Sequence, residues 1–102
     1  MGIAYAHDEE QWIAGKALKD PVSNAYCCGP VDCRALGSED VREVSGGFAV
    51  HMTTDVGVDV NEVIPYNRAM PIAPDGRYHA CLGWAYPNKP KIRCFITPPG
   101  ST

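Results

Sequence analysis

The sequence predicts a small α+β domain that is mostly β. We expect one N-terminal helix packed on a strongly bent antiparallel sheet or small barrel of about four or five strands, stapled by disulfides. Three observations predict this fold class. Ten glycines and nine prolines in 102 residues favour turns and short strands over long helices. Short apolar runs are bounded by turn residues. Five cysteines in so short a chain are typical of a disulfide framework.

The helix is expected over residues 8–19, DEEQWIAGKALK. Asp8 can accept the free N–H groups of the first turn, and Gln11 three residues later completes a pair resembling a capping box. Pro21 ends the helix, because a residue that precedes proline avoids the α region. Apolar side chains fall on or near one face at helical spacing, and they are Trp12, Ile13, Ala17 and Leu18.

The chain after an irregular stretch over 20–40 is expected to form strands. Ser45-Gly46-Gly47 is a short hairpin turn between VREV and FAVHM. A Pro-Asp-Gly turn at 74–76 precedes a later strand. The expected strands span 41–44, 48–52, 58–66, 77–84 and 91–97. A chain of this length forms one domain, which we expect over 7–102.

The disulfide candidates are Cys27, Cys28, Cys33, Cys81 and Cys94. Antiparallel pairing of the last two strands can place Cys81 opposite Cys94, so a bond between them is the best guess. It would close a loop of about 14 residues and contribute on the order of 3 kcal/mol. Cys33 is then expected to pair with Cys27 or Cys28. Spacing does not fix connectivity, so a bond from the 27–33 cluster to Cys81 or Cys94 stays open, and one thiol is left over.

Metal and thiol-exchange chemistry fit the cysteine spacing less well. Structural zinc ligands typically come in C-x₂₋₄-C and H-x₃₋₅-H pairs. The sequence offers C-C-x₄-C, H-x-C and a separate Cys94 instead. The C-x-x-C spacing of thioredoxin-like exchange does not occur.

The compartment follows from the cysteines and from the first residues. Disulfides persist in oxidising compartments, so we expect a periplasmic or secreted protein. Ala4-Tyr5-Ala6 fits the small-x-small pattern that signal peptidase cuts after, so 1–6 are expected to be a leader-peptide remnant or residues added for expression. No stretch approaches the apolar length of about 20 residues that spans a bilayer. The net charge of −3 argues against a nucleic-acid partner.

Four stretches, HDEEQW, CCGPVDCRAL, APDGRYHAC and RCFITPPGS, occur in that order over residues 7–101. Together they resemble the pattern of a family of small exported bacterial proteins rich in cysteine, whose mature chains start at His-Asp. The resemblance implies export and a single domain, and it supplies no activity. On this resemblance the pattern positions are His7, Trp12, Cys27, Cys28, Asp32, Cys33, His79, Cys81, Cys94 and Phe95.

Two histidines are candidate metal ligands. If the chain is cut after Ala6, the amine and imidazole of His7 could chelate copper, a metal that suits nitrogen ligands, with His79 or His51 as a further ligand. The opposing interpretation is that His7 is a plain terminal residue and that His79, two positions before Cys81, is hydrogen-bonded beside a disulfide. Arg77 and Arg93 are interpreted as surface strand residues rather than as an anion site.

The leading functional hypothesis is a non-enzymatic binding module for another protein or a component of the cell envelope. No nucleophile elbow or glycine-rich phosphate loop occurs, so nucleophilic and phosphoryl-transfer chemistry lack sequence support. The alternative is a periplasmic copper- or zinc-binding protein that uses His7 and His79. A third hypothesis gives the leftover cysteine a redox or dimerising role; we expect a monomer, or a weak or disulfide-linked dimer.

Overall fold

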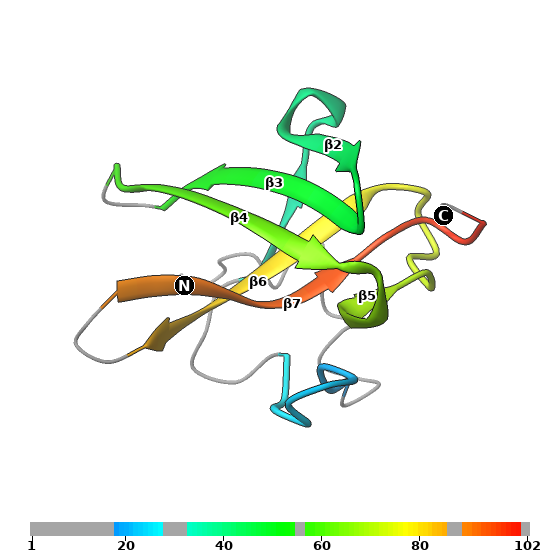
Figure 1. Ribbon diagram of the computed structural model, residues 1–102, viewed down its shortest axis with the longest axis horizontal. Coiled ribbons are helices and arrows are strands. Elements are labelled where there is room, and N and C mark those ends of the chain that lie inside the picture. Colours follow the sequence, from blue (N-terminus) through cyan, green and yellow to red (C-terminus); the bar gives the residue numbers. More distant parts are fainter. Residues whose placement is uncertain (1–17, 28–32, 55–56, 86–88, 101–102) are drawn as a thin grey trace, which may run out of the picture.

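Seven strands form two sheets in the computed structural model, which describes residues 18–27, 33–54, 57–85 and 89–100. One sheet has four strands in the order β1-β6-β7-β5, and the other has three in the order β2-β3-β4. The two sheets lie face to face (Figure 1). The strands are β1 (Cys33–Leu36), β2 (Val41–Val44), β3 (Gly47–Thr53), β4 (Asp59–Pro65), β5 (Ala69–Met70), β6 (Tyr78–Ala85) and β7 (Lys89–Ile96).

The three-stranded sheet is a meander whose first turn was predicted correctly. Strands β2 and β3 pair in antiparallel register from Val41 opposite Val50 to Val44 opposite Gly47. Gly46 has a φ of 86°, a left-handed conformation that costs glycine little, and it lets this tight turn close. Alternation along β3 and β4 then directs one row of apolar side chains inward: Phe48, Val50, Met52, Val60 and Ile64.

The four-stranded sheet carries a bulge on β7. Strand β6 lies between β1 and β7 and pairs with both in antiparallel register. Cys81 pairs with Cys94 while Leu82 pairs with Ile92, so Arg93 is an extra residue without a partner on β6. A bulge resets the alternation of a strand. Ile92 and Phe95 can therefore both face the three-stranded sheet, in one hydrophobic cluster.

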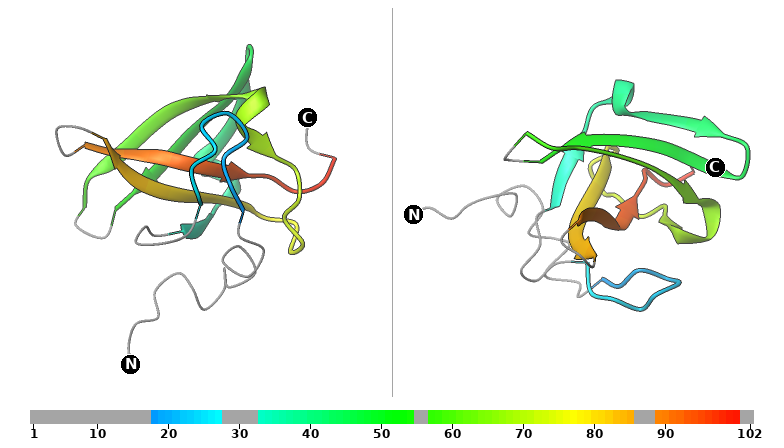
Figure 2. Two further views of the ribbon diagram at one scale, coloured as in Figure 1. Left: turned by 90° about the horizontal axis from the view of Figure 1, so that it is seen from below. Right: turned by 60° about the vertical axis from the view of Figure 1, so that its left-hand side comes forward.

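The four-stranded sheet is buried on both of its faces. One face packs on the three-stranded sheet through Leu36, Ala80, Leu82, Ile92 and Phe95. A second cluster holds the four disulfide cysteines with Met70, Ala73 and Ile96, and Leu18 packs against it. The segment 18–27 runs along this side of the sheet, away from the three-stranded sheet (Figure 2).

Parts of the expected fold are wrong. The mostly β architecture is confirmed, but the two sheets do not close into a barrel, and β5 pairs with β7 in parallel. The expected helix over 8–19 falls outside the described residues except at its end. There Lys19 forms a β-bridge with Tyr26, and Leu18 accepts a hydrogen bond from the Cys27 N–H, so the end of that helix was wrong. Helices in the described part are two 3-10 turns, η1 (Ser38–Asp40) and η2 (Tyr66–Arg68).

The best-guess disulfide pairing is also wrong. Cys81 and Cys94 do lie opposite each other, as expected. Cys81 is nevertheless bonded to Cys33, its partner on the other neighbouring strand β1, and Cys94 is bonded to Cys27 in the segment 18–27. The physical reason is that β6 is a central strand, so Cys81 has a cysteine on each side. The structure thus adopts the alternative in which the 27–33 cluster reaches both later cysteines, while Cys28 lies outside the described residues.

Trypsin digestion of the unreduced protein distinguishes the two pairings. Cleavage after lysine and arginine, with Lys89 protected by Pro90, releases the cysteine-containing peptides 20–34, 78–91 and 94–102. The Cys27–Cys94 and Cys33–Cys81 bonds hold all three peptides together in one disulfide-linked species, which mass spectrometry of the unreduced digest should detect. A separate 78–91 plus 94–102 pair, with 20–34 unattached, would contradict the structure.

A candidate anion-binding cleft beside strand β7

A buried aspartate organises the segment 18–27. The side chain of Asp20 accepts hydrogen bonds from the Val22 and Ser23 N–H groups at 3.1 and 2.7 Å. This is the local turn that an Asp-Pro sequence favours. Asn24, at a φ of 64°, adopts the left-handed conformation that asparagine tolerates well, and its N–H donates to the Asp20 carbonyl. The segment therefore folds back on itself.

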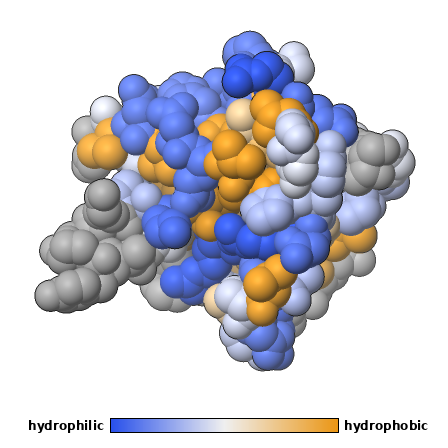
Figure 3. Space-filling view, in the orientation of Figure 1, coloured by the Kyte–Doolittle hydropathy of each residue, from blue (hydrophilic) through white to orange (hydrophobic). Residues whose placement is uncertain are grey.

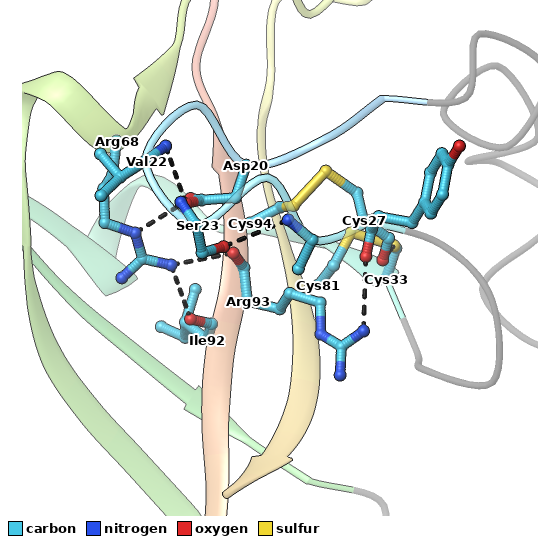
Figure 4. Close-up of a disulfide and its surroundings, with 12 residues drawn as sticks. Asp20, Val22, Ser23, Cys27, Cys33, Arg68, Cys81, Ile92, Arg93 and Cys94 are labelled. Carbon is cyan, nitrogen blue, oxygen red and sulfur yellow. Dashed lines mark hydrogen bonds and ion pairs between the residues drawn. A yellow bond between two sulfur atoms is a disulfide. The ribbon is translucent and has the colours of Figure 1, made fainter.

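Arg68 ties this turn to the edge of β7. Its Nε donates to the Asp20 carboxylate at 2.9 Å, and its Nη2 donates to the carbonyls of Ile92 and Arg93 at 3.0 and 2.8 Å (Figure 4). Strand β5 pairs with β7 only at Phe95 and Ile96, so it does not reach these carbonyls. The guanidinium of Arg68 takes the place that a neighbouring strand would have there.

Glu62 completes the same edge. Its Oε1 accepts the Ile92 N–H at 2.9 Å, across the seam between β4 and β7. The backbone groups of β7 at the bulge are thus satisfied by side chains rather than by a strand, which is one way in which proteins protect a sheet edge. A closed barrel would have required backbone hydrogen bonds between β4 and β7 at this position.

The charge of Asp20 is stabilised although the residue is only 1% exposed. Burial by itself raises the pKa of its carboxyl group. Hydrogen bonds from the Ser23 backbone and side chain and from Arg68, together with the charge of that guanidinium, outweigh burial and hold the pKa below its ordinary value. Asp20 therefore remains ionised and paired at neutral pH.

A cleft of about 520 Å³ lies between the 18–27 segment and β7, and Asp20, Arg68, Lys91 and Arg93 are its charged lining residues. One negative and three positive charges give a local net charge of +2, whereas the whole chain carries −3. Glu62 lies at the margin, with its carboxylate 3.8 Å from the Lys91 Nζ. Figure 3 shows a hydrophilic band on this side of the molecule, between hydrophobic side chains over β3 and β4 and a smaller hydrophobic group near the 18–27 segment.

Arg93 is the side chain of this cleft with the most unused hydrogen-bonding capacity. It lies across Gly83, where a Cβ atom would come within 2.6 Å of the Arg93 Nε. Its Nη1 donates to the Tyr26 carbonyl at a long 3.5 Å (Figure 4). Among the described residues no carboxylate pairs with it. A guanidinium has five N–H donors, so Arg93 can still receive an anionic group.

The two candidate metal ligands that the structure describes, His51 and His79, do not come together. His79 is fully buried, with its Nε2 2.9 Å from both oxygens of Asp75. Burial by itself raises the pKa of Asp75. Hydrogen bonds from His79 and from the Arg77 N–H outweigh burial, so the pKa lies below its ordinary value. His51 lies in β3 on the other sheet, and His7 falls outside the described residues. In the described part of the chain no three histidine, cysteine or acidic side chains form a group that could hold a metal.

Sequence reasoning missed Asp20 and Arg68 and assigned Arg93 to the strand surface. Asp-Pro-x-Ser at 20–23 is a turn signal that could have pointed to Asp20. Arg68 lies 48 residues further along the chain, and no local pattern connects the two. The position of Arg93 depends on a bulge, which the sequence does not mark.

Comparison of the chain with protein-family models, with curated proteins and with solved structures finds no match in any of the three. The family resemblance drawn from the cysteine and histidine motifs therefore stays a prediction. Within the ranges that the structure describes, no helix is long and apolar enough to cross a membrane.

Replacing Arg68 by alanine should lower the free energy of unfolding at neutral pH by about 3 kcal/mol, because it leaves the buried Asp20 charge without its partner. Urea unfolding measures this loss. The exposed Arg42 is the matched control, and its alanine variant should stay within about 0.5 kcal/mol of the wild type.

The same variant has a defined pH dependence. Since the folded-state pKa of Asp20 is lowered, its contribution is present above the unfolded value of about 3.9 and is lost as pH falls through the folded-state value. The difference in the free energy of unfolding between the wild type and Arg68→Ala should therefore become smaller in acid. An equal difference at pH 7 and in strong acid would contradict the pairing.

Proposed function

We propose that this protein is an exported, non-enzymatic binding module that takes an acidic segment of a protein partner in the cleft between residues 18–27 and β7. The observation that carries the proposal is Arg93, a half-buried guanidinium without a carboxylate partner among the described residues, in a cleft of net charge +2. Export is supported by the two disulfides, which persist outside the reducing cytosol.

The cleft has the two components of a peptide-binding site. Arg93 and Lys91 supply positive charge, and a guanidinium can hold a carboxylate through two parallel hydrogen bonds. Val22 and Ala25 supply apolar surface beside these charges, and Val22 is 58% exposed. A carboxylate next to an apolar side chain suits this combination better than a small inorganic anion does, because the anion would leave the apolar wall uncovered.

The walls of the cleft are fixed before a ligand arrives. The Cys27–Cys94 bond and the Asp20–Arg68 pair hold the 18–27 segment against β7 from two sides. A preformed cleft loses little conformational entropy on binding, which favours affinity from a small contact area.

A titration of the ¹⁵N-labelled protein with a short blocked peptide that alternates aspartate and leucine tests the proposal. The matched ligand is the same peptide with asparagine in place of aspartate. We expect the acidic peptide to shift the amide signals of Val22, Ser23, Ile92 and Arg93, and the asparagine peptide to bind at least tenfold more weakly. Such a ratio corresponds to about 1.4 kcal/mol, within reach of one charge-assisted hydrogen bond.

Arg93→Gln should lose most of the preference for the acidic peptide, while Arg42→Gln on the other sheet should keep it. Raising the salt concentration should weaken binding of the acidic peptide to the wild type. Equal affinity for both peptides, equal effects of the two arginine variants, or shifts confined to residues outside the cleft would each overturn the proposal.

A further inference from the structure

His51 connects three separate elements on the outer face of the three-stranded sheet. Its side chain projects from β3 and is 41% exposed. The Nδ1 atom lies 3.0 Å from the Asp40 Oδ1, at the end of η1. The Nε2 atom lies 3.2 Å from the Asp59 Oδ1, at the start of β4. One imidazole thus bridges a turn and a strand that do not follow each other in the chain.

Both ring nitrogens face an acceptor, and this fixes which protonation state satisfies the geometry. An ionised carboxylate only accepts hydrogen bonds, and only the protonated imidazole carries a proton on both nitrogens. The two carboxylates lie on opposite ring nitrogens, so they do not converge on a common point as metal ligands would. In agreement, the hydrogen bonds that His51 donates to Asp40 first and to Asp59 second raise its pKa above the ordinary value.

The two contacts differ in how easily they can open. Asp59 is 64% exposed and also accepts a hydrogen bond from the Thr53 hydroxyl at 2.8 Å. Asp40 is 28% exposed, and in the described part of the chain its carboxylate contacts the side chain of His51. Neutral His51 keeps one proton, and it is best placed on Nδ1 towards Asp40, since Asp59 retains Thr53 as a donor.

The remaining charges around His51 come from several elements. Glu39 of η1, Arg42 of β2 and Glu62 of β4 line the same shallow groove of about 310 Å³ on this face. Arg34 of β1 donates to the Thr53 carbonyl at 2.9 Å. With Asp40, the groove carries three acidic residues and one arginine, so its net charge changes from −1 to −2 when His51 loses its proton.

We propose that His51 is a pH-dependent latch that ties η1 to the first residue of β4 across β3, and that releases Asp59 when it loses its proton to solvent. At pH values below the folded-state pKa of His51 the latch is closed. As pH rises through the folded-state pKa of His51, the Asp59 contact opens and the groove beside it becomes more negative. The latch shares no lining residue with the cleft at β7, although Glu62 of the groove also lies at the margin of that cleft.

Side-chain ¹⁵N NMR of histidine over pH 5 to 9 tests the latch. We expect His51 to titrate above pH 6.5 and to become the Nδ1–H tautomer when it is neutral. The amide chemical shifts of Asp59 and Thr53 should change with pH at the same midpoint as His51. Asp40→Asn and Asp59→Asn should each lower that midpoint. Asp75→Asn, which alters the His79 pair on the other sheet, is the matched control and should leave the His51 midpoint unchanged.

His51→Gln provides a second readout. A raised folded-state pKa contributes stability below the unfolded value of about 6.5 and loses it as pH rises through the folded value. The free energy of unfolding of the wild type should therefore exceed that of His51→Gln by more at pH 5.5 than at pH 8.5. Titration of His51 at or below 6.5, or Asp59 signals that do not follow it, would overturn the latch.

Discussion

The structure depends on holding one irregular segment, residues 18–27, against the second face of the four-stranded sheet. A small domain buries a modest fraction of its surface, and here a central sheet needs cover on both faces. The three-stranded sheet covers one face with large apolar side chains. The other face carries cysteines and Ile96, and its cover is fastened by the Cys27–Cys94 bond and by the Asp20–Arg68 pair. The bond spans 67 residues, and by chain entropy such a cross-link contributes about 4 kcal/mol.

The candidate cleft is a consequence of this fastening. The bulge at Arg93 exposes carbonyls on the edge of β7. Arg68 donates to them through its Nη2 while Asp20 accepts a hydrogen bond from its Nε. The same bulge directs Arg93 over Gly83, next to the segment that Asp20 has folded. Arg68 brings positive charge to this cleft because the carbonyls of Ile92 and Arg93 need donors there, and Lys91 and Arg93 add two further charges. Stability and the proposed binding of acidic segments therefore share residues, and variants at Arg93 separate the two better than variants at Arg68.

Local sequence patterns predicted most strands, but they did not predict which residues far apart in the chain contact each other. The hairpin at β2 and β3 follows from Gly46 and from alternation on both sides, and β4, β6 and β7 fall within a few residues of the expected ranges. The short strand β1, CRAL, carries neither a β-branched nor an aromatic residue, and it falls in the stretch over 20–40 for which the sequence predicts irregular structure. Its presence beside β6 decides the disulfide pattern, since it gives Cys81 a partner other than Cys94. The Asp20–Arg68 pair and the bulge exist only once distant segments have met.

Native-state hydrogen exchange of the segment 18–27 tests the central claim most directly. The N–H groups of Asp20, Asn24 and Cys27 donate to the carbonyls of Ala25, Asp20 and Leu18. If the segment is an integral layer of the fold, these three amides should exchange only through global unfolding, with the same opening free energy as the amides that pair β6 with β7. Exchange of the three at rates typical of an unprotected loop, while β6 and β7 stay protected, would contradict the account.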